Sequence, residues 1–223
     1  MEIDSNTPRQ MAEKIVMVDD QLHCIYGPAV VKSDGETQWW IHGELHRIEG
    51  PAIVRADGTR EWWIRGKRHR LAGPAFIFAN NDMEWWVDGK LHRSTGPAVV
   101  RGRRSEWWMR GKRHRTATSC SCGIHEEDYE CQTLTRCGPP AVIDGESGLR
   151  EWWFQGRRHR DMLPAVYTSN GERHWYEEGK KHRLQGPAVV CPSGKIEYWE
   201  SGRRIIKSKS SKIANPYTEK TFK

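Results

Sequence analysis

Histidine is the side chain in this sequence whose type and spacing most suggest chemistry. Seven of the ten histidines recur about 23 residues apart, or at a multiple of that spacing: His23, His46, His69, His92, His114, His159 and His182. An imidazole can act as a general acid or base, or bind a metal ion. An active site, however, needs one asymmetric group of residues, and each of these histidines has the same neighbours in sequence. The pattern therefore favours structural histidines, and we expect the chain not to be an enzyme.

A second candidate for chemistry lies in the cysteine-bearing stretch 116–138. Five side chains of the types that bind zinc occur there: Cys120, Cys122, His125, Cys131 and Cys137. Their Cys-x-Cys pair followed by unequal gaps matches no specific zinc-site spacing. A zinc site and a set of ordinary thiols both remain open, the thiols are favoured, and we expect no cofactor. The sequence shows neither a secretory signal nor a membrane span, so we expect reduced thiols in a cytoplasmic protein.

The elements that would position these residues are internal repeats. A representative unit is GPAIVRADGTREWWIRGKRHRLA, which starts at Gly50. Each unit contains two residue-Gly turn signals between β-prone runs, and its proline and glycines oppose a helix. The sequence therefore predicts an all-β protein, an elongated tandem array of seven to eight hairpin units that forms a twisted, largely single-layer sheet.

The repeats also suggest the domain boundaries. We expect an N-terminal cap or arm over 1–20, the array over 21–204 and a basic tail over 205–223. The gap in the histidine column between His114 and His159 is 45 residues, or two periods, so 116–138 is interpreted as a degenerate repeat within the array.

The short turn at His42-Gly43 predicts a hairpin register. It pairs Trp40 with Leu45 and Trp39 with His46. Continued by one residue, the same register pairs the acid before each Trp-Trp with the arginine of each His-Arg, as Glu61–Arg70, Glu84–Arg93, Glu106–Arg115 and Glu151–Arg160. Opposite charges across a sheet stabilise it, so we expect a ladder of these pairs. A two-residue turn at Asp34-Gly35 would place Val30 opposite Trp39.

Adjacent tryptophans must point to opposite faces of a strand. One face is predicted to carry the valine of the first strand and a structural ladder: Trp39, His46, Trp62, His69, Trp85, His92, Trp107, His114, Trp152, His159, Trp175 and His182. The other face carries a candidate binding stripe: Arg68, Arg113, Arg158, Lys181, Trp63, Trp108, Trp153 and Tyr176. In that stripe we expect cations without acidic partners, free to lie over the aromatic rings or to contact a ligand.

The net charge of +7 is concentrated at one end of the chain. Residues Arg203–Lys223 contain seven Lys or Arg and one acid, Glu219, which leaves the repeats nearly neutral. Such a tail can attract nucleic acid, an acidic protein or an acidic membrane surface. A solvated arm and a docking segment are both compatible with it.

The units resemble the MORN (membrane occupation and recognition nexus) repeat family, through stretches such as EWWIRGKRHRLAGPAFIFAN over about residues 20 to 204. The variant HR-x-x-GPA pattern is similar to forms found in large DNA viruses, phages and bacteria. The resemblance implies an array of β-hairpins that serves as a scaffold or dimerises, with protein or lipid contacts.

Two functions follow as expectations. The first is a non-enzymatic scaffold for protein–protein assembly with a protein partner or a second copy of the chain, including a structural or assembly component within a virus particle. The second is binding of nucleic acid or anionic lipid through the basic tail and the candidate binding stripe. No small-molecule substrate is expected, because no nucleophile motif, phosphate loop or paired-carboxylate site occurs.

Overall fold

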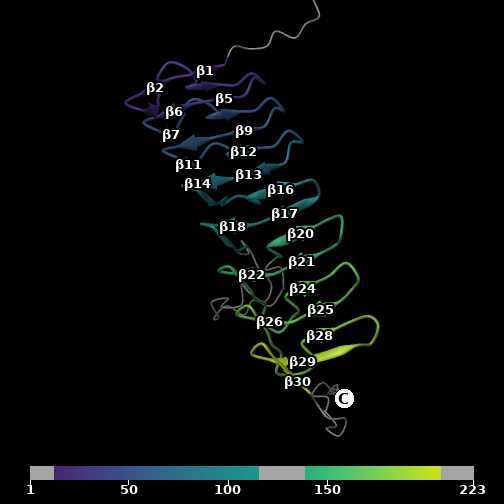
Figure 1. Ribbon diagram of the computed structural model, residues 1–223. Helices are drawn as coiled ribbons and strands as arrows, with labels where there is room; N and C mark the ends of the chain where they lie inside the picture. The colour runs from purple at the N-terminus through teal and green to yellow at the C-terminus, as the bar shows by residue number, and fades with distance from the viewer. Residues whose placement is uncertain (1–12, 116–138, 207–223) are drawn as a thin grey trace, which may run out of the picture.

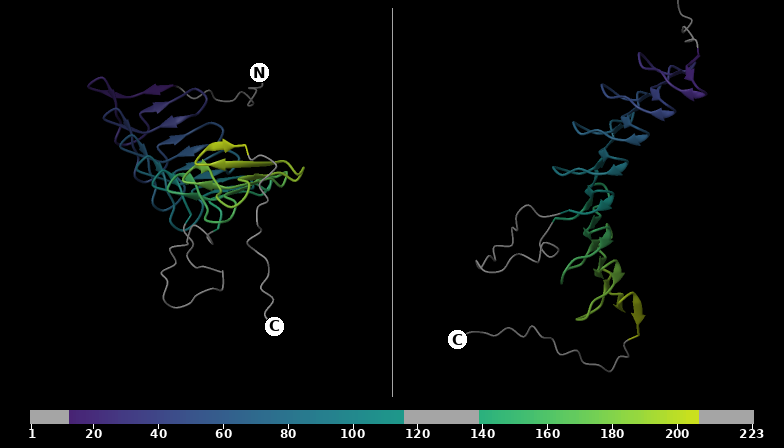
Figure 2. Two further views of the ribbon diagram at one scale, coloured as in Figure 1. Left: turned by 90° about the horizontal axis from the view of Figure 1, so that it is seen from below. Right: turned by 90° about the vertical axis from the view of Figure 1, so that its left-hand side faces the viewer.

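The computed structural model describes residues 13–115 and 139–206. Over these ranges the chain is an elongated all-β array in which units follow one another in chain order (Figure 1). Viewed along its length, the units fan out instead of superimposing, so the array twists (Figure 2). In the same ranges no helix occurs that could cross a membrane.

One antiparallel sheet runs the length of the array. In spatial order its sixteen strands are β1 (Lys14–Ile15), β4 (Val30–Val31), β5 (Thr37–Gln38), β8 (Ile53–Val54), β9 (Arg60–Glu61), β12 (Phe76–Ile77), β13 (Met83–Glu84), β16 (Val99–Arg101), β17 (Arg104–Glu106), β20 (Val142–Asp144), β21 (Arg150–Glu151), β24 (Val166–Tyr167), β25 (Arg173–His174), β28 (Val189–Val190), β29 (Ile196–Glu200) and β30 (Arg203–Ile205). We call its repeated strand pairs the long hairpins.

A row of two-stranded sheets, the short hairpins, follows the long hairpins along one side of the array. They are β2 (Met17–Val18) with β3 (Gln21–Leu22), β6 (Trp40–Ile41) with β7 (Glu44–Leu45), β10 (Trp63–Ile64) with β11 (Lys67–Arg68), β14 (Trp86–Val87) with β15 (Lys90–Leu91), β18 (Trp108–Met109) with β19 (Lys112–Arg113), β22 (Trp153–Phe154) with β23 (Arg157–Arg158), and β26 (Tyr176–Glu177) with β27 (Lys180–Lys181). In most units the first Trp separates the long hairpin from the short one.

The predicted register of the short hairpins is confirmed. Trp40 lies opposite Leu45, and the backbone N–H of His46 donates to the carbonyl of Trp39 at 3.0 Å. His42 and Gly43 both have positive φ, at 48° and 72°, as a type I′ turn requires.

The predicted register of the long hairpins is wrong by one residue. Val30 lies opposite Gln38 and not Trp39, because Ser33, Asp34 and Gly35 form a three-residue loop. Only the glycine of this loop has a positive φ, which fits a type I turn closed by a bulge. A shift of one residue moves side chains to the other face, so the Val30 position shares its face with the second Trp and the first Trp shares its face with Ala29.

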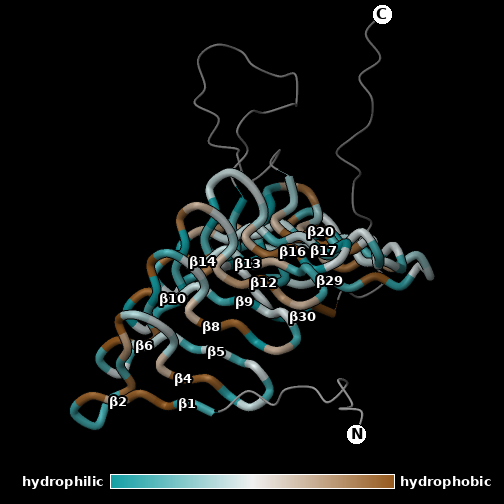
Figure 3. The backbone as a smooth tube through the Cα atoms, turned by 90° about the horizontal axis from the view of Figure 1, so that it is seen from above, coloured by the Kyte–Doolittle hydropathy of each residue, from teal (hydrophilic) through white to brown (hydrophobic). Residues whose placement is uncertain are grey.

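The core is thin and repeats with the units. The alanines at the GPA position are almost fully buried, and the next residue is buried in most units, as with Ile53 and Val142. Hydrophobic and hydrophilic segments alternate along the tube, and β4 and β8 are among the hydrophobic ones (Figure 3). Burial therefore depends on contacts between neighbouring units, as expected for a repeat array.

The long sheet continues from the strand before the cysteine-bearing stretch to the strand after it. β17 pairs with β20, with Glu106 opposite Val142. β17 and β20 are therefore neighbours in the long sheet, and the interpretation of 116–138 as a degenerate repeat stays a prediction. The stretch itself lies outside the described residues.

At the N-terminal end, part of the predicted cap belongs to the array. β1 pairs with β4, and Ile15 lies opposite Val30. β2 and β3 then form the first short hairpin, so the boundary expected at residue 20 falls inside that hairpin. The described part of the array thus starts with one strand of the long sheet and one short hairpin.

Candidate binding surface

The face of the second Trp is built around a buried glutamate in most units. Glu61 is 1% exposed, and its Oε2 accepts from the indole N–H of Trp63 at 3.1 Å and from Arg68 at 3.1 Å. Its Oε1 pairs with Arg55. A buried carboxylate is tolerated only with such partners, so these contacts hold the centre of the unit together.

The predicted Glu–Arg ladder is therefore wrong in its partners. The arginine of the candidate binding stripe, and not the arginine of His-Arg, neutralises the glutamate: Arg68 pairs with Glu61, Arg113 with Glu106 and Arg158 with Glu151. In the third unit Leu91 replaces this arginine, and Arg101 pairs with Glu84 from the neighbouring strand. The expectation that the stripe cations lack acidic partners is wrong for these three arginines.

The stripe side chains do lie over aromatic rings, and each bridges two units. The Cζ of Arg68 is 5.1 Å from the ring centre of Trp63 and 5.5 Å from that of Trp86 in the next unit. Arg113 lies similarly between Trp108 and Trp153, Arg158 lies between Trp153 and Tyr176, and Lys181 lies over Trp199. These side chains are thus committed to internal contacts, and the stripe is a poor ligand surface.

The charge of Glu106 is preserved by its partners. Burial alone would raise the pKa of Glu106, but the hydrogen bond from Arg104 and the charge of Arg113 hold that pKa below its ordinary value. Glu106 accordingly stays ionised at neutral pH and keeps both arginines in place.

On the other face, the arginine of each His-Arg covers the first Trp. Arg70 lies 4.0 Å from the ring centre of Trp62, and its Nη1 donates to the carbonyl of Pro74 at 3.1 Å. A Cβ on Gly73 would lie 3.2 Å from the guanidinium, so glycine allows this close approach. The same stacking recurs as Arg47–Trp39, Arg93–Trp85, Arg115–Trp107, Arg160–Trp152 and Arg183–Trp175. The first tryptophans are thereby covered within the chain.

Each histidine of the column joins its unit to the next one. The backbone N–H of Arg47 donates to the carbonyl of Trp63 in the following short hairpin, and the N–H of Gly66 donates to the carbonyl of Leu45. Between these two hydrogen bonds, His46 lies opposite two residues, Ile64 and Arg65. This is the geometry of a β-bulge, and the bulged N–H of Arg65 donates to Nδ1 of His46 at 3.3 Å.

We call this contact the histidine joint, and it recurs along the array. The donors to His23, His69, His92, His114, His159 and His182 are the backbone N–H groups of His42, Asp88, Arg110, Gln155, Glu178 and Ser201. Because a bulged N–H needs an acceptor, Nδ1 completes these connections between units by accepting, and at His69 it also lies 2.9 Å from Oδ1 of Asp88.

In the histidine joints, each imidazole ring is held by a hydrogen bond within the array. Burial lowers the pKa of His114, which favours the neutral ring that the joint requires. Within 13–115 and 139–206 no group of His, Cys, Asp or Glu side chains is arranged to hold a metal ion. The zinc candidates Cys120, Cys122, His125, Cys131 and Cys137, and the tail beyond residue 206, lie outside the described residues.

Exposed apolar side chains occur in the segments that connect the His-Arg of one unit to the Gly-Pro of the next. Ile48 and Leu71 are each 80% exposed and Leu184 is 74% exposed, each directly after the arginine. Ile25 and Met162 occupy related places. We call these five side chains the connection row. Sequence analysis missed this row, although the apolar residue after His-Arg in several units was a visible signal.

A groove of about 420 Å³ opens beside the connection row. Leu71, Trp85 and Arg93 line it, together with Ser94 and Thr95. The small Ser94 stands where Ile48 and Leu71 stand in the preceding units. Trp85, on which Arg93 stacks, forms part of the groove wall.

The described fold is that of a β-hairpin repeat array whose charged and aromatic side chains serve mainly to connect its units. No protein-family model matches the chain, and no curated protein was found that matches it.

Proposed function

We propose that the chain is a non-enzymatic scaffold whose activity is assembly, and that the connection row is its contact surface. The supporting observation is the regular exposure of large apolar side chains at this row, beside the groove at Trp85. Single exposed apolar residues are ordinary, but a series at related places in several units forms a surface suited to protein contact.

A second copy of the chain is the proposed partner. Equivalent residues in successive units are two strands apart, or about 10 Å along the sheet. A partner that contacts several units must carry groups with the same period, and another copy does so automatically. Two copies related by a two-fold axis would place the connection rows against each other.

The resemblance of the HR-x-x-GPA units to MORN-like arrays supports this proposal, and it makes a role in assembly of a virus particle part of the proposal. The alternative, nucleic acid or lipid binding through the candidate stripe, is less favoured, because Arg68, Arg113 and Arg158 already pair with glutamates.

The experiment is light scattering of the purified full chain over a range of concentrations in high salt. The triple variant Ile48→Ser, Leu71→Ser, Leu184→Ser should lower the fraction of oligomer at least ten-fold. The control Ile15→Ser, Ile196→Ser removes apolar side chains that are 69% and 47% exposed elsewhere and should leave assembly unchanged. A monomer at all concentrations, or equal effects of both variants, would refute the proposal.

A further inference from the structure

Four short hairpins place an apolar side chain directly opposite a cation. The pairs are Ile64 with Lys67, Val87 with Lys90, Met109 with Lys112, and Phe154 with Arg157. Residues directly opposite in a hairpin share a face, with Cβ atoms about 5 Å apart. We call this series the apolar–cation ladder.

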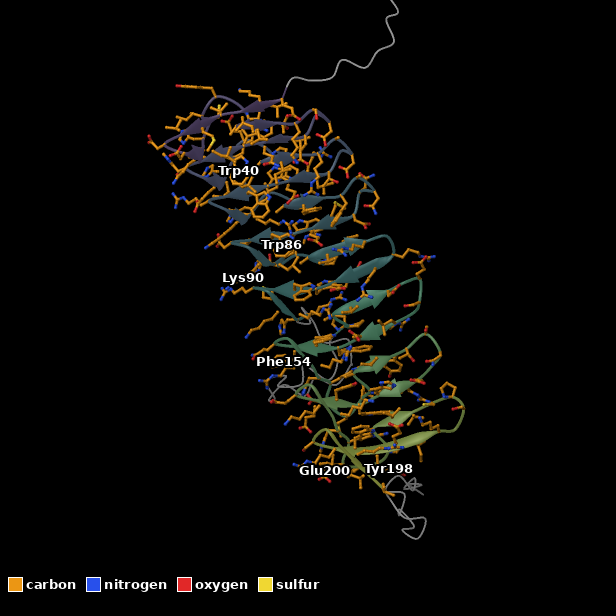
Figure 4. All side chains as sticks on the ribbon, viewed as in Figure 1. Trp40, Trp86, Lys90, Phe154, Tyr198 and Glu200 are labelled. Carbon is orange, nitrogen blue, oxygen red and sulfur yellow. The ribbon has the colours of Figure 1, made fainter. Side chains whose placement is uncertain are left out.

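The cations of the ladder are available to a ligand. Lys67, Lys90 and Lys112 are exposed and have no ion pair within the described chain. Arg157 pairs with Glu178, but both side chains are mostly exposed, so this pair is weak. Lys90 extends outward from the edge of the array (Figure 4). The ladder thus differs from the candidate stripe, whose arginines neutralise buried glutamates.

Other charges near the ladder add to its positive character. Arg65 and Arg110 occupy the turns beside Lys67 and Lys112 and also lack acidic partners in the described ranges. Two acids lie near these turns: Asp88, whose carboxylate lies 2.9 Å from Nδ1 of His69, and Glu44, whose side chain lies over Gly66. Over these three turns cations therefore outnumber acids, although the repeats as a whole are nearly neutral.

The pairing of an apolar residue with a cation is absent from the short hairpins on either side of the ladder. The preceding short hairpin pairs Ile41 with Glu44, and the following one pairs Glu177 with Lys180. Both hairpins keep the same backbone and turn, so the repeat fold itself does not require an apolar residue opposite a cation. This restriction marks the ladder as a distinct surface.

The shape of the ladder favours a flexible ligand. Its rungs are about 10 Å apart along the short-hairpin row. Because the array twists, the row follows a curved path, and a flat surface could contact few rungs at once (Figure 2). A flexible chain could follow all of them.

We infer that the apolar–cation ladder binds single-stranded nucleic acid without sequence preference. Phosphates would contact Lys67, Lys90, Lys112 and Arg157, and bases would lie against the apolar partners, with Phe154 offering an aromatic ring that is 40% exposed. A nucleotide has a negative charge that complements the cation of each rung. It also has a flat apolar surface that can pack against the apolar side chain of the rung.

The test is fluorescence anisotropy with a labelled oligothymidylate and the full chain at several salt concentrations. The variant Lys67→Gln, Lys90→Gln, Lys112→Gln should weaken binding at least ten-fold and reduce the slope of log affinity against log salt by about 2. The matched control Arg60→Gln, Arg150→Gln, Arg173→Gln removes three exposed charges from the long hairpins and should change binding less than three-fold.

Two further arms separate the ladder from other polyanion contacts. Phe154→Ser should weaken oligothymidylate binding about three-fold with the salt slope unchanged, since it removes stacking and not charge. Equal losses in the two triple variants would overturn the inference. So would a loss in the ladder variant seen only with phosphatidylserine vesicles or a polyglutamate peptide and not with the oligonucleotide.

Discussion

The first and second units provide an acceptor for the indole N–H of their second Trp with different side chains. In the second unit, charged Glu61 accepts from Trp63 and pairs with Arg68. In the first unit, Gln38 and Leu45 take the places of Glu61 and Arg68, and Trp40 donates to Oε1 of Gln38 at 2.9 Å. The indole bond is thus present in both units, whereas the glutamate–arginine pair at these two positions occurs in one. In the first unit the charged group is Glu36, which accepts from Nε2 of Gln38 at 2.6 Å and pairs with Lys32.

This difference separates two requirements. An acceptor oxygen two residues before the second Trp satisfies its indole N–H, and either an amide or a carboxylate provides it. A cation is required only when that acceptor is charged, because an unpaired buried carboxylate is costly. At these two positions the first unit is therefore a natural uncharged version of the second.

The largest expected effect comes from leaving the buried charge without its main partner. Arg68→Leu should destabilise the second unit by about 3 kcal/mol, because Glu61 would keep only the partly exposed Arg55. Chemical denaturation, with native-state hydrogen exchange to locate the change, would measure it. Arg60→Leu in the same unit is the control and should cost little.

The double variant Glu61→Gln, Arg68→Leu reproduces the Gln38 and Leu45 side chains of the first unit. It should recover most of the stability lost in Arg68→Leu. We expect a net cost below about 1 kcal/mol, which gives a coupling energy of at least about 3 kcal/mol in a double-mutant cycle. Additive effects of the two substitutions would contradict the comparison.

Glu61→Gln alone should have a smaller effect, about 1 to 2 kcal/mol. The amide keeps an acceptor for Trp63, but Arg68 and Arg55 lose their charged partner. Both arginine side chains are partly exposed, so water can solvate them. Thermal unfolding would measure the change, and a cost equal to that of Glu61→Ala would show that the indole bond contributes nothing.

The histidine joint should be equally important in both units. His46→Ala and His69→Ala each remove the acceptor of a bulged N–H and should each cost about 1 kcal/mol. Amide exchange at Arg65 and Asp88 would report each joint directly. A joint that matters in only one of the two units would show that its contribution depends on the charged core.

The smallest effect concerns pH. Burial lowers the pKa of His114, so its contribution to stability is complete above the unfolded value of about 6.5 and is lost as the pH falls below it. His114→Gln should therefore reduce the loss of stability between pH 7 and pH 5 by less than about 1 kcal/mol. Denaturation midpoints at several pH values would detect this, and an unchanged pH profile would contradict it.

Much of the fold was predictable from local signals. The period, the hairpins and the opposite directions of adjacent tryptophans follow from the spacing of Gly, Pro and Trp-Trp. The short turn at His42-Gly43 was predicted correctly, because the register of a two-residue loop follows from its turn residues.

The candidate site was predicted less well, for a specific reason. Asp34-Gly35 is compatible with both a two-residue and a three-residue loop, and the difference of one residue exchanges the faces of Val30 and Ala29. The extrapolation from Trp39–His46 to Glu61–Arg70 also failed, because the chain bends at the first Trp and Arg70 bonds to the next unit.

The sequence by itself determined that this protein is a β-hairpin array, because turn residues and alternating side chains act over a few neighbouring positions. Only the tertiary structure decided which arginine neutralises each glutamate, which N–H each histidine accepts from, and that β17 pairs with β20. Those contacts join residues in different strands and different units, and their geometry depends on how the units stack and twist.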